Sequence, residues 1–240
     1  MTVCWFALFH HAAGQPSDEE LDWLDQFITV TPGLRRGLIY TPSATNDPYL
    51  DDGPPPVLGL QLYFDEIAWL EAAMAAHGHL QGLLRADAMP SLRDADVTQQ
   101  AMLVRRFPVP DATFRTLPGE LPCTYLVAYE GKADDLNAWH AHYITSHPPI
   151  MARFPGIRQI EIYTCIDWCG FLPWRRVEHM QRNKVVFDSP AALTGALNSP
   201  VRHEMRSDFG RFPSFSGPNK HYPMLTRTVR AGRLADSGES

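Results

Sequence analysis

Apolar, aromatic-rich segments alternate with amphipathic segments along this chain. Residues 4–10 and 123–129 are apolar runs of strand length. After each run, acidic or capping residues precede apolar positions about 3.6 residues apart, at 21–27 and 136–143, which indicates a helix. A Pro-Gly pair at 32–33 and at 155–156 ends each helix and leads into a second strand.

The later elements continue this parallel. In both places a polar loop leads to a third strand, which ends at Phe64 or at Phe187. A second helix then begins at about residue 66 or 190, and a last strand lies near 102–107 or 223–229. The pattern therefore predicts the order βαββαβ, twice.

An internal repeat explains this parallel. Residues 32–41 match residues 155–164 at an offset of 123, with six of ten positions identical. The same offset aligns Phe64-Asp65 with Phe187-Asp188, and an offset of 122 aligns residues 102–105 with 224–227. We therefore predict repeat 1 at 1–110, a linker at 111–121, repeat 2 at 122–232 and a flexible tail at 233–240.

A βαββαβ unit forms a four-stranded antiparallel sheet with both helices on one face, so its other face must be covered. Two such sheets packed face to face give a barrel whose interior can hold a ligand. We therefore expect an α+β fold in which two tandem ferredoxin-like repeats form an intramolecular α/β barrel of the kind usually built by two chains. The chain would act as a monomer or a homodimer.

Composition narrows the class of partner. With 45% apolar and 20% charged residues the chain resembles folded soluble proteins. A net charge of −6 without a basic block lacks the electrostatic footprint of nucleic-acid binding, and the apolar N-terminus is too short to span a membrane. Four cysteines without zinc-site spacing predict reduced thiols and a cytoplasmic protein. The expected partner is a small molecule.

The two copies differ at the end of their first helix. Copy two has seven extra residues before its Pro-Gly pair, and it places His140, His142 and His147 within eight residues of one another. Such asymmetry predicts one site rather than two, located in copy two.

These residues resemble the EthD-like branch of the dimeric α/β-barrel superfamily. Trp139, Tyr143, His147-Pro148-Pro149 and the following Pro-Gly pair look like its aromatic, Tyr and His-x-Pro pattern, and the ferredoxin-like repeats span nearly all of residues 3–230. Copy one lacks the His and its Pro neighbours. The resemblance implies a barrel-interior site, frequently without metal or organic cofactor. It also implies aromatic, polyketide-like or lactone substrates and lyase, isomerase or monooxygenase activity.

His147 is the leading catalytic candidate. Trp139, Tyr143 and His147 are spaced i, i+4, i+8 and share one helical face, and an imidazole suits proton transfer near neutral pH. The alternative is that His147 caps the helix ahead of Pro148. Tyr143 would serve as a second acid or as a hydrogen-bond donor, or it would belong to the core, and Trp139 would contact substrate or only pack.

The second strand of copy two supplies a carboxylate. Alternation places Ile160 and Ile162 on one face and Glu161 and Tyr163 on the other, which would point into the barrel. A carboxylate in an apolar lumen would have a raised pKa and could act as acid or base, whereas in a wet barrel it would be a solvated strand residue. Tyr163 and Tyr40 could hold a phenol or a carboxylate.

Further binding candidates lie at strand ends and in one loop. His10 and His179 would either face the lumen or be structural histidines. The aromatic loop at 167–176 could cover the barrel with Trp168 and place Arg176 on an anionic group, or it could pack on the surface.

Together these features predict a lyase without metal, haem or organic cofactor that acts on an aromatic or polyketide-like acid inside the barrel. His147 would move the proton, assisted by Tyr143 and Glu161. Two alternatives stay open: a haem enzyme with a proximal His in copy two, and a non-catalytic binder of a hydrophobic metabolite.

Overall fold

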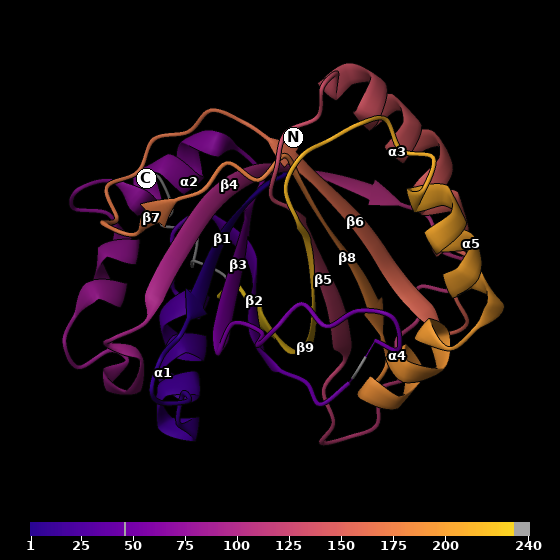
Figure 1. Ribbon diagram of the computed structural model, residues 1–240. Coiled ribbons are helices and arrows are strands. Elements are labelled where there is room, and N and C mark those ends of the chain that lie inside the picture. The colour runs from indigo at the N-terminus through magenta and orange to yellow at the C-terminus, as the bar shows by residue number, and fades with distance from the viewer. Residues whose placement is uncertain (46, 233–240) are drawn as a thin grey trace, which may run out of the picture.

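The computed structural model describes residues 1–45 and 47–232, and its centre is a closed barrel (Figure 1). The strands follow one another around the barrel in the order β1-β3-β2-β9-β5-β8-β6-β4, and a β1–β4 pair closes it. All these pairs are antiparallel. The barrel strands are β1 (Val3–His10), β2 (Leu34–Pro42), β3 (Leu58–Phe64), β4 (Asp96–Phe107), β5 (Cys123–Tyr129), β6 (Ile157–Cys165), β8 (Gln181–Phe187) and β9 (Asn219–Arg230). The two-residue β7 (Arg175–Arg176) lies parallel to β4.

Helices cover the outside of the barrel (Figure 1). Two lie against the first half of the chain and three against the second half. They are α1 (Asp18–Thr29), α2 (Ile67–Met74), α3 (Leu136–Met151), α4 (Pro190–Leu197) and α5 (Pro200–Phe209), with two short 3-10 helices at His79–Leu84 and Pro90–Leu92. None of the helices in the described part of the chain is long and apolar enough to cross a membrane.

The barrel expected from the sequence is confirmed. The two halves order their strands alike, as β4-β1-β3-β2 and as β9-β5-β8-β6, and they join through the β2–β9 and β4–β6 pairs. The origin of the halves as ferredoxin-like repeats and the boundaries at 110 and 122 stay predictions, and the predicted tail at 233–240 lies outside the described residues. The helix α5 and the 3-10 helices were not predicted.

The fold has three apolar clusters. One lies between the barrel and α1 and α2, and a second lies between the barrel and α3, α4 and α5. The third fills the middle of the barrel, since the interior of an eight-stranded barrel is narrow enough for side chains to fill it. Its buried members are Cys4, Phe6, Leu8, Leu38, Tyr40, Tyr63, Met102, Leu126, Tyr163 and Met224. The middle of the barrel is therefore core, and the cavities that bear on ligand binding among the described residues lie at its end or outside it.

Candidate active site

Helix α3 places the leading candidates against the outer face of the sheet. The helix begins where the Asp135 carboxylate accepts from the backbone N–H groups of Asn137 and Ala138, and it continues through both prolines to Met151. His147 therefore lies inside the helix, 5% exposed, and does not cap it. The capping interpretation is wrong, since the imidazole bonds to a carboxylate on another helix.

That carboxylate is Asp208 of α5. Its Oδ2 lies 2.7 Å from Nδ1 of His147, and the residue is fully buried. Ser146 donates to Oδ2 at 3.2 Å, and Arg211 donates to Oδ1 at 3.2 Å. A carboxylate on Nδ1 selects the neutral tautomer that carries its proton there, which leaves the lone pair of Nε2 free.

The protonation state of the pair follows from its surroundings. Burial lowers the pKa of His147 to about 4, and the hydrogen bond to Asp208 offsets only part of that effect. Burial alone would raise the pKa of Asp208, but the hydrogen bonds from His147 and Ser146 hold it below its ordinary value. At neutral pH the pair is an imidazole beside a carboxylate, which is the state of a general base.

Tyr143 and Trp139 pack beside this pair. Asn183 of β8 donates to the Tyr143 hydroxyl at 2.7 Å, and burial raises the pKa of this tyrosine well above its ordinary value. The Tyr143 ring stacks on Trp139 at 5.1 Å and lies 4.9 Å from the His147 ring. Trp139 is fully buried and belongs to the apolar cluster between the barrel and the helices α3, α4 and α5.

A small cavity borders His147. It has a volume of about 50 Å³ and lies between the barrel and the helices α3, α4 and α5. Met151, Met205 and Arg202 line it together with His147. Arg202 donates to Asp47 at 2.7 Å, but its buried Nε has no acceptor among the described residues. The cavity therefore combines a base with an unsatisfied guanidinium donor.

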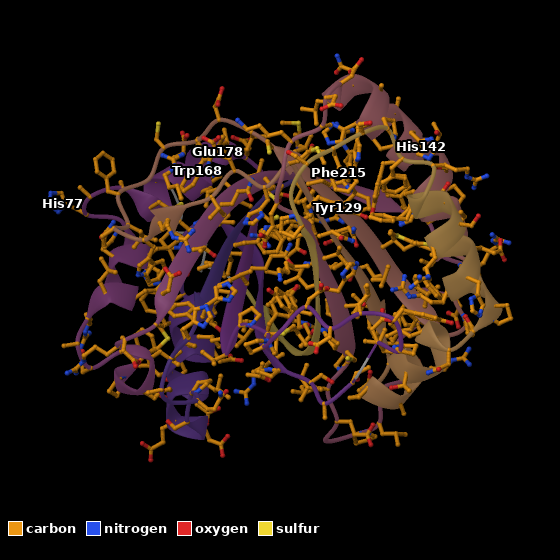
Figure 2. The ribbon with its side chains drawn as sticks, in the orientation of Figure 1. His77, Tyr129, His142, Trp168, Glu178 and Phe215 are labelled. Atoms are coloured by element: carbon orange, nitrogen blue, oxygen red, sulfur yellow. The ribbon has the colours of Figure 1, made fainter. Side chains whose placement is uncertain are left out.

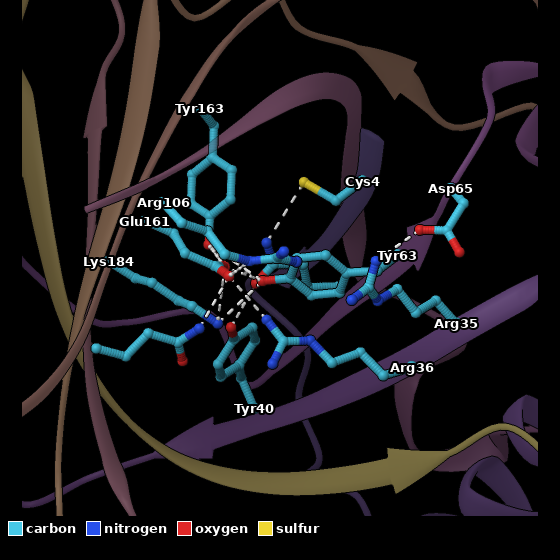
Figure 3. A network of polar contacts seen from close by, with 12 residues as sticks. Cys4, Arg35, Arg36, Tyr40, Tyr63, Asp65, Arg106, Glu161, Tyr163 and Lys184 are labelled. Carbon is cyan, nitrogen blue, oxygen red and sulfur yellow. Dashed lines mark hydrogen bonds and ion pairs between the residues drawn. The ribbon is translucent and has the colours of Figure 1, made fainter. Parts of the chain in front are cut away.

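Glu161 lies on the other face of the sheet, inside the barrel (Figure 3). It is fully buried and accepts from Tyr63 at 2.5 Å, from Tyr163 at 2.8 Å and from Arg36 at 2.9 Å, with Lys184 Nζ at 3.3 Å. Gln159 and Arg106 also donate to it, at 2.8 and 3.2 Å.

The expected raised pKa of Glu161 is wrong. Burial does raise it, but Lys184, Arg36 and the two tyrosine hydroxyls overcome that effect and lower the pKa to about 2. The carboxylate is therefore charged at neutral pH. It links the two halves of the barrel, because Glu161 belongs to the second half and its donors Arg36 and Tyr63 belong to the first. Tyr40, also predicted as a binding residue, is fully buried in the barrel and donates to Gln61 at 2.6 Å.

The structure thus separates the predicted site residues. Tyr143 and Trp139 belong to the apolar cluster between the barrel and the helices α3, α4 and α5, and His147 packs against Tyr143. Tyr163 and Tyr40 belong to the cluster inside the barrel. The expectation that His147 acts inside the barrel is wrong, because helices of this fold cover the outer face of the sheet. The predicted orientation of β6, with Ile160 and Ile162 outward, is confirmed.

The remaining candidates gather at one end of the barrel. His10 and His179 line a cavity of about 210 Å³ together with Arg182. Trp168 and Arg176 line a larger cavity of about 910 Å³ beside it, together with Glu178, which Figure 2 labels near Trp168.

The loop at 167–176 holds itself in place at this end. The Arg176 guanidinium lies 3.7 Å from the centre of the Trp168 ring and donates to the Trp168 carbonyl at 2.7 Å. Arg176 is thereby held over the loop itself.

Sequence reasoning missed Asp208, Arg202, Arg182 and Lys184. Asp208 lies in the helix α5, which was not predicted, and it is 61 positions from its partner His147. Arg182 and Lys184 could have been found, since both alternate with Asn183 and Val185 on a predicted strand and so belong on the inner face with Glu161.

Comparison with known proteins shows the fold. No protein-family model matches the chain, and no curated protein matches it. Among solved structures, an anthrone oxidase-like protein has a TM-score of 0.62 at 12% identity, over 99% of this chain and 97% of its own. A proposed monooxygenase from Lactobacillus acidophilus NCFM has a TM-score of 0.54 at 10% identity, over 97% of this chain and 98% of its own. A second proposed monooxygenase, from Fusobacterium nucleatum subsp. nucleatum ATCC 25586, has a TM-score of 0.59 at 7% identity, over 97% of this chain and 95% of its own. The chain is therefore an α+β barrel that shares its fold with these three structures.

Proposed function

We propose that this protein is an enzyme that moves a proton on an aromatic or polyketide-like acid, in the manner of the EthD-like branch. The reaction would be a decarboxylation, dehydration or cyclisation without an added cofactor. The observation that carries this proposal is the buried pair of His147 and Asp208, 2.7 Å apart, beside a cavity.

The proposed chemistry starts at Nε2 of His147. This nitrogen takes a proton from a phenolic hydroxyl or from a carbon next to a carbonyl group. Asp208 stabilises the imidazolium that forms and holds the ring in position. In a decarboxylation, the bond between carbon and the substrate carboxylate breaks, CO₂ leaves, and the imidazolium returns the proton to that carbon. In a dehydration, the imidazolium protonates a hydroxyl, which leaves as water. A positioned base of this kind contributes about 10²–10⁴-fold in rate.

Arg202 supports an acid as the substrate. It lines the same cavity as His147, its Nε has no acceptor among the described residues, and a guanidinium suits a carboxylate. The cavity of about 50 Å³ has to enlarge before it admits an aromatic ring. Met151 and Met205 provide the room, because unbranched thioether side chains adopt other rotamers readily.

The two rival functions make different demands on the structure. A haem held by His147 would need a pocket of several hundred Å³, far more than the cavity of about 50 Å³ beside this residue. A non-catalytic binder of a hydrophobic metabolite is the second candidate, favoured by the cavity of about 910 Å³ that Leu136, Ile166 and Met180 help to line.

We also propose that the two halves are tandem ferredoxin-like repeats with their boundary in the linker at 111–121. Support comes from the shared strand order and from the pairs that join the halves.

Proton exchange tests the proposal without knowledge of the full reaction. Hydroxybenzoic acids and 1,3-diketo acids are incubated with the protein in D₂O, and deuterium incorporation at carbon is followed by mass spectrometry. We expect exchange with the wild type, and a loss of about 10²-fold or more in His147→Gln. The matched control is His77→Gln, an exposed histidine far from α3 (Figure 2). Ligand binding without exchange or turnover by the wild type would favour the non-catalytic binder.

A further inference from the structure

A buried arginine without a counter-charge marks a second site, on the inner face of the sheet. Arg182 is 2% exposed and lines the cavity of about 210 Å³ at one end of the barrel. Its guanidinium makes no hydrogen bond or ion pair with residues 1–45 or 47–232, and its Nε is buried. The contrast is with Arg36 and Lys184 further along the barrel, which share the carboxylate of Glu161.

The acidic groups at this end do not neutralise Arg182. Asp96 is committed to Arg175, whose Nη2 lies 2.7 Å from its carboxylate. Glu130 is exposed and forms no ion pair with Arg182 in the described part of the chain. The ring of Phe6, whose centre lies 5.3 Å from the guanidinium carbon, offsets only part of the cost of burying the charge.

Two imidazoles face the same cavity. Burial, His11 and Arg182 lower the pKa of His10 to about 4, and burial with Arg182 lowers the pKa of His179 to about 3. The buried Nδ1 of His179 has no hydrogen-bond partner among the described residues. At neutral pH both rings are uncharged, and each has an N–H to donate.

We propose that this end of the barrel binds the carboxylate or phosphate group of a small molecule, held by the guanidinium of Arg182 and the imidazoles of His10 and His179. The anion supplies the counter-charge that Arg182 lacks, and the guanidinium fork fits the oxygens of either group. The cavity of about 910 Å³ shares Val177 with this one, so the rest of the ligand has space beside it.

This site is independent of the proposed reaction. Arg182 lies on the inner face of β8, and the pocket of His147 lies on the outer face. Loss of anion binding would therefore leave the His147 proposal standing, and the reverse also holds.

Binding at this site is coupled to protons. An anion raises the pKa of both histidines above about 4 and about 3, so the protein takes up protons on binding and affinity rises as the pH falls towards 4. The other titratable or charged groups that line the cavity are His11, Asp96, Glu130, Arg175 and Tyr222. Arg175 holds the pKa of Asp96 below its ordinary value, so this carboxylate adds little to the dependence as the pH falls from 7 towards 4.

The test uses the full-length protein in a zwitterionic buffer low in chloride. Phosphate and benzoate are titrated separately, with calorimetry for Kd and thermal denaturation for Tm. We expect at least one of them to bind and to raise Tm by about 5–10 °C at one hundred times Kd. A response to phosphate alone identifies a phosphate group as the ligand, and a response to benzoate alone identifies a carboxylate.

Arg182→Met separates an anion site from a structural arginine. The variant should bind the anion about 10–100-fold more weakly, yet melt no lower than the wild type without anion, because it removes an unpaired buried charge. The double variant His10→Asn, His179→Asn should keep part of the affinity and lose its pH dependence. Arg85→Gln, which breaks an exposed pair with Asp87, is the control that binds normally. The proposal is overturned if neither anion binds the wild type at tens of mM, or if Arg182→Met binds as tightly as the wild type.

Discussion

Replacing Glu161 by Gln should destabilise the barrel without abolishing proton transfer. The substitution keeps the shape of the side chain but removes the only carboxylate that contacts Arg36 and Lys184 in the described structure. Both cations would then lie in the barrel without a counter-charge, and the hydroxyls of Tyr63 and Tyr163 would lose a charged acceptor.

The size of the effect follows from burial. Glu161 is fully buried, and removing one partner from a buried ion pair costs about 3–5 kcal/mol, because an uncompensated charge is left behind. For a chain of 240 residues each kcal/mol lowers Tm by about 2–4 °C, so the variant should melt about 6–20 °C below the wild type.

Acid pH gives a second signature of the same network. The pKa of Glu161 is lowered in the folded state to about 2, against an ordinary value of 4.5. Its contribution to stability is therefore complete above pH 4.5 and is lost as the pH falls towards 2. The variant should lack this part of the acid dependence.

The assay is thermal denaturation followed by circular dichroism, between pH 3 and 7. Glu204→Gln is the control, because Glu204 pairs with Arg153 on the surface and such pairs contribute at most about 1 kcal/mol. Equal Tm values for Glu161→Gln and the wild type would show that the network does not hold the halves together. A folded Glu161→Gln that has lost all activity would restore the carboxylate as a catalytic candidate.

Three further predictions concern the site of His147, outside the barrel. Asp208→Asn should lower kcat by about 10²–10⁴-fold with little change in Tm. An amide that donates to Nδ1 of His147 forces the proton of the ring onto Nε2, which can then no longer act as a base, and an unchanged kcat would contradict this. Arg202→Gln should raise KM for acid substrates more than it lowers kcat, and steady-state kinetics with an acid and its amide decide this. The unfolding free energy should fall from pH 6.5 to 4, because the folded-state pKa of His147 is lowered to about 4; denaturant titrations should find a shallower slope in His147→Gln.

The strands were predictable because their periodicity is local. Alternation along β6 placed Ile160 outward and Glu161 inward, and the structure agrees. The position of His147 was also within reach of the sequence: a βαββαβ unit puts its helices on one face of the sheet, so a residue on α3 that faces the sheet cannot reach the barrel interior.

Other features depend on pairings that one sequence does not show. The lowered pKa of Glu161 requires Arg36 and Tyr63, which reach it only through the closure of the barrel across both halves. Asp208 lies near the end of α5, a short and mostly polar helix. No pattern in the sequence around Asp208 indicates its contact with His147, which is 61 positions away.

The most direct test of the central claim is kcat against pH for the wild type and His147→Gln, on a substrate identified by the exchange assay. If His147 is the base, kcat of the wild type should be constant at neutral pH and fall as the pH drops towards about 4. The variant should keep its fold and lose about 10²–10⁴-fold in kcat at neutral pH. A variant that melts lower but turns over substrate at the wild-type rate would show instead that the pair of His147 and Asp208 only joins α3 to α5.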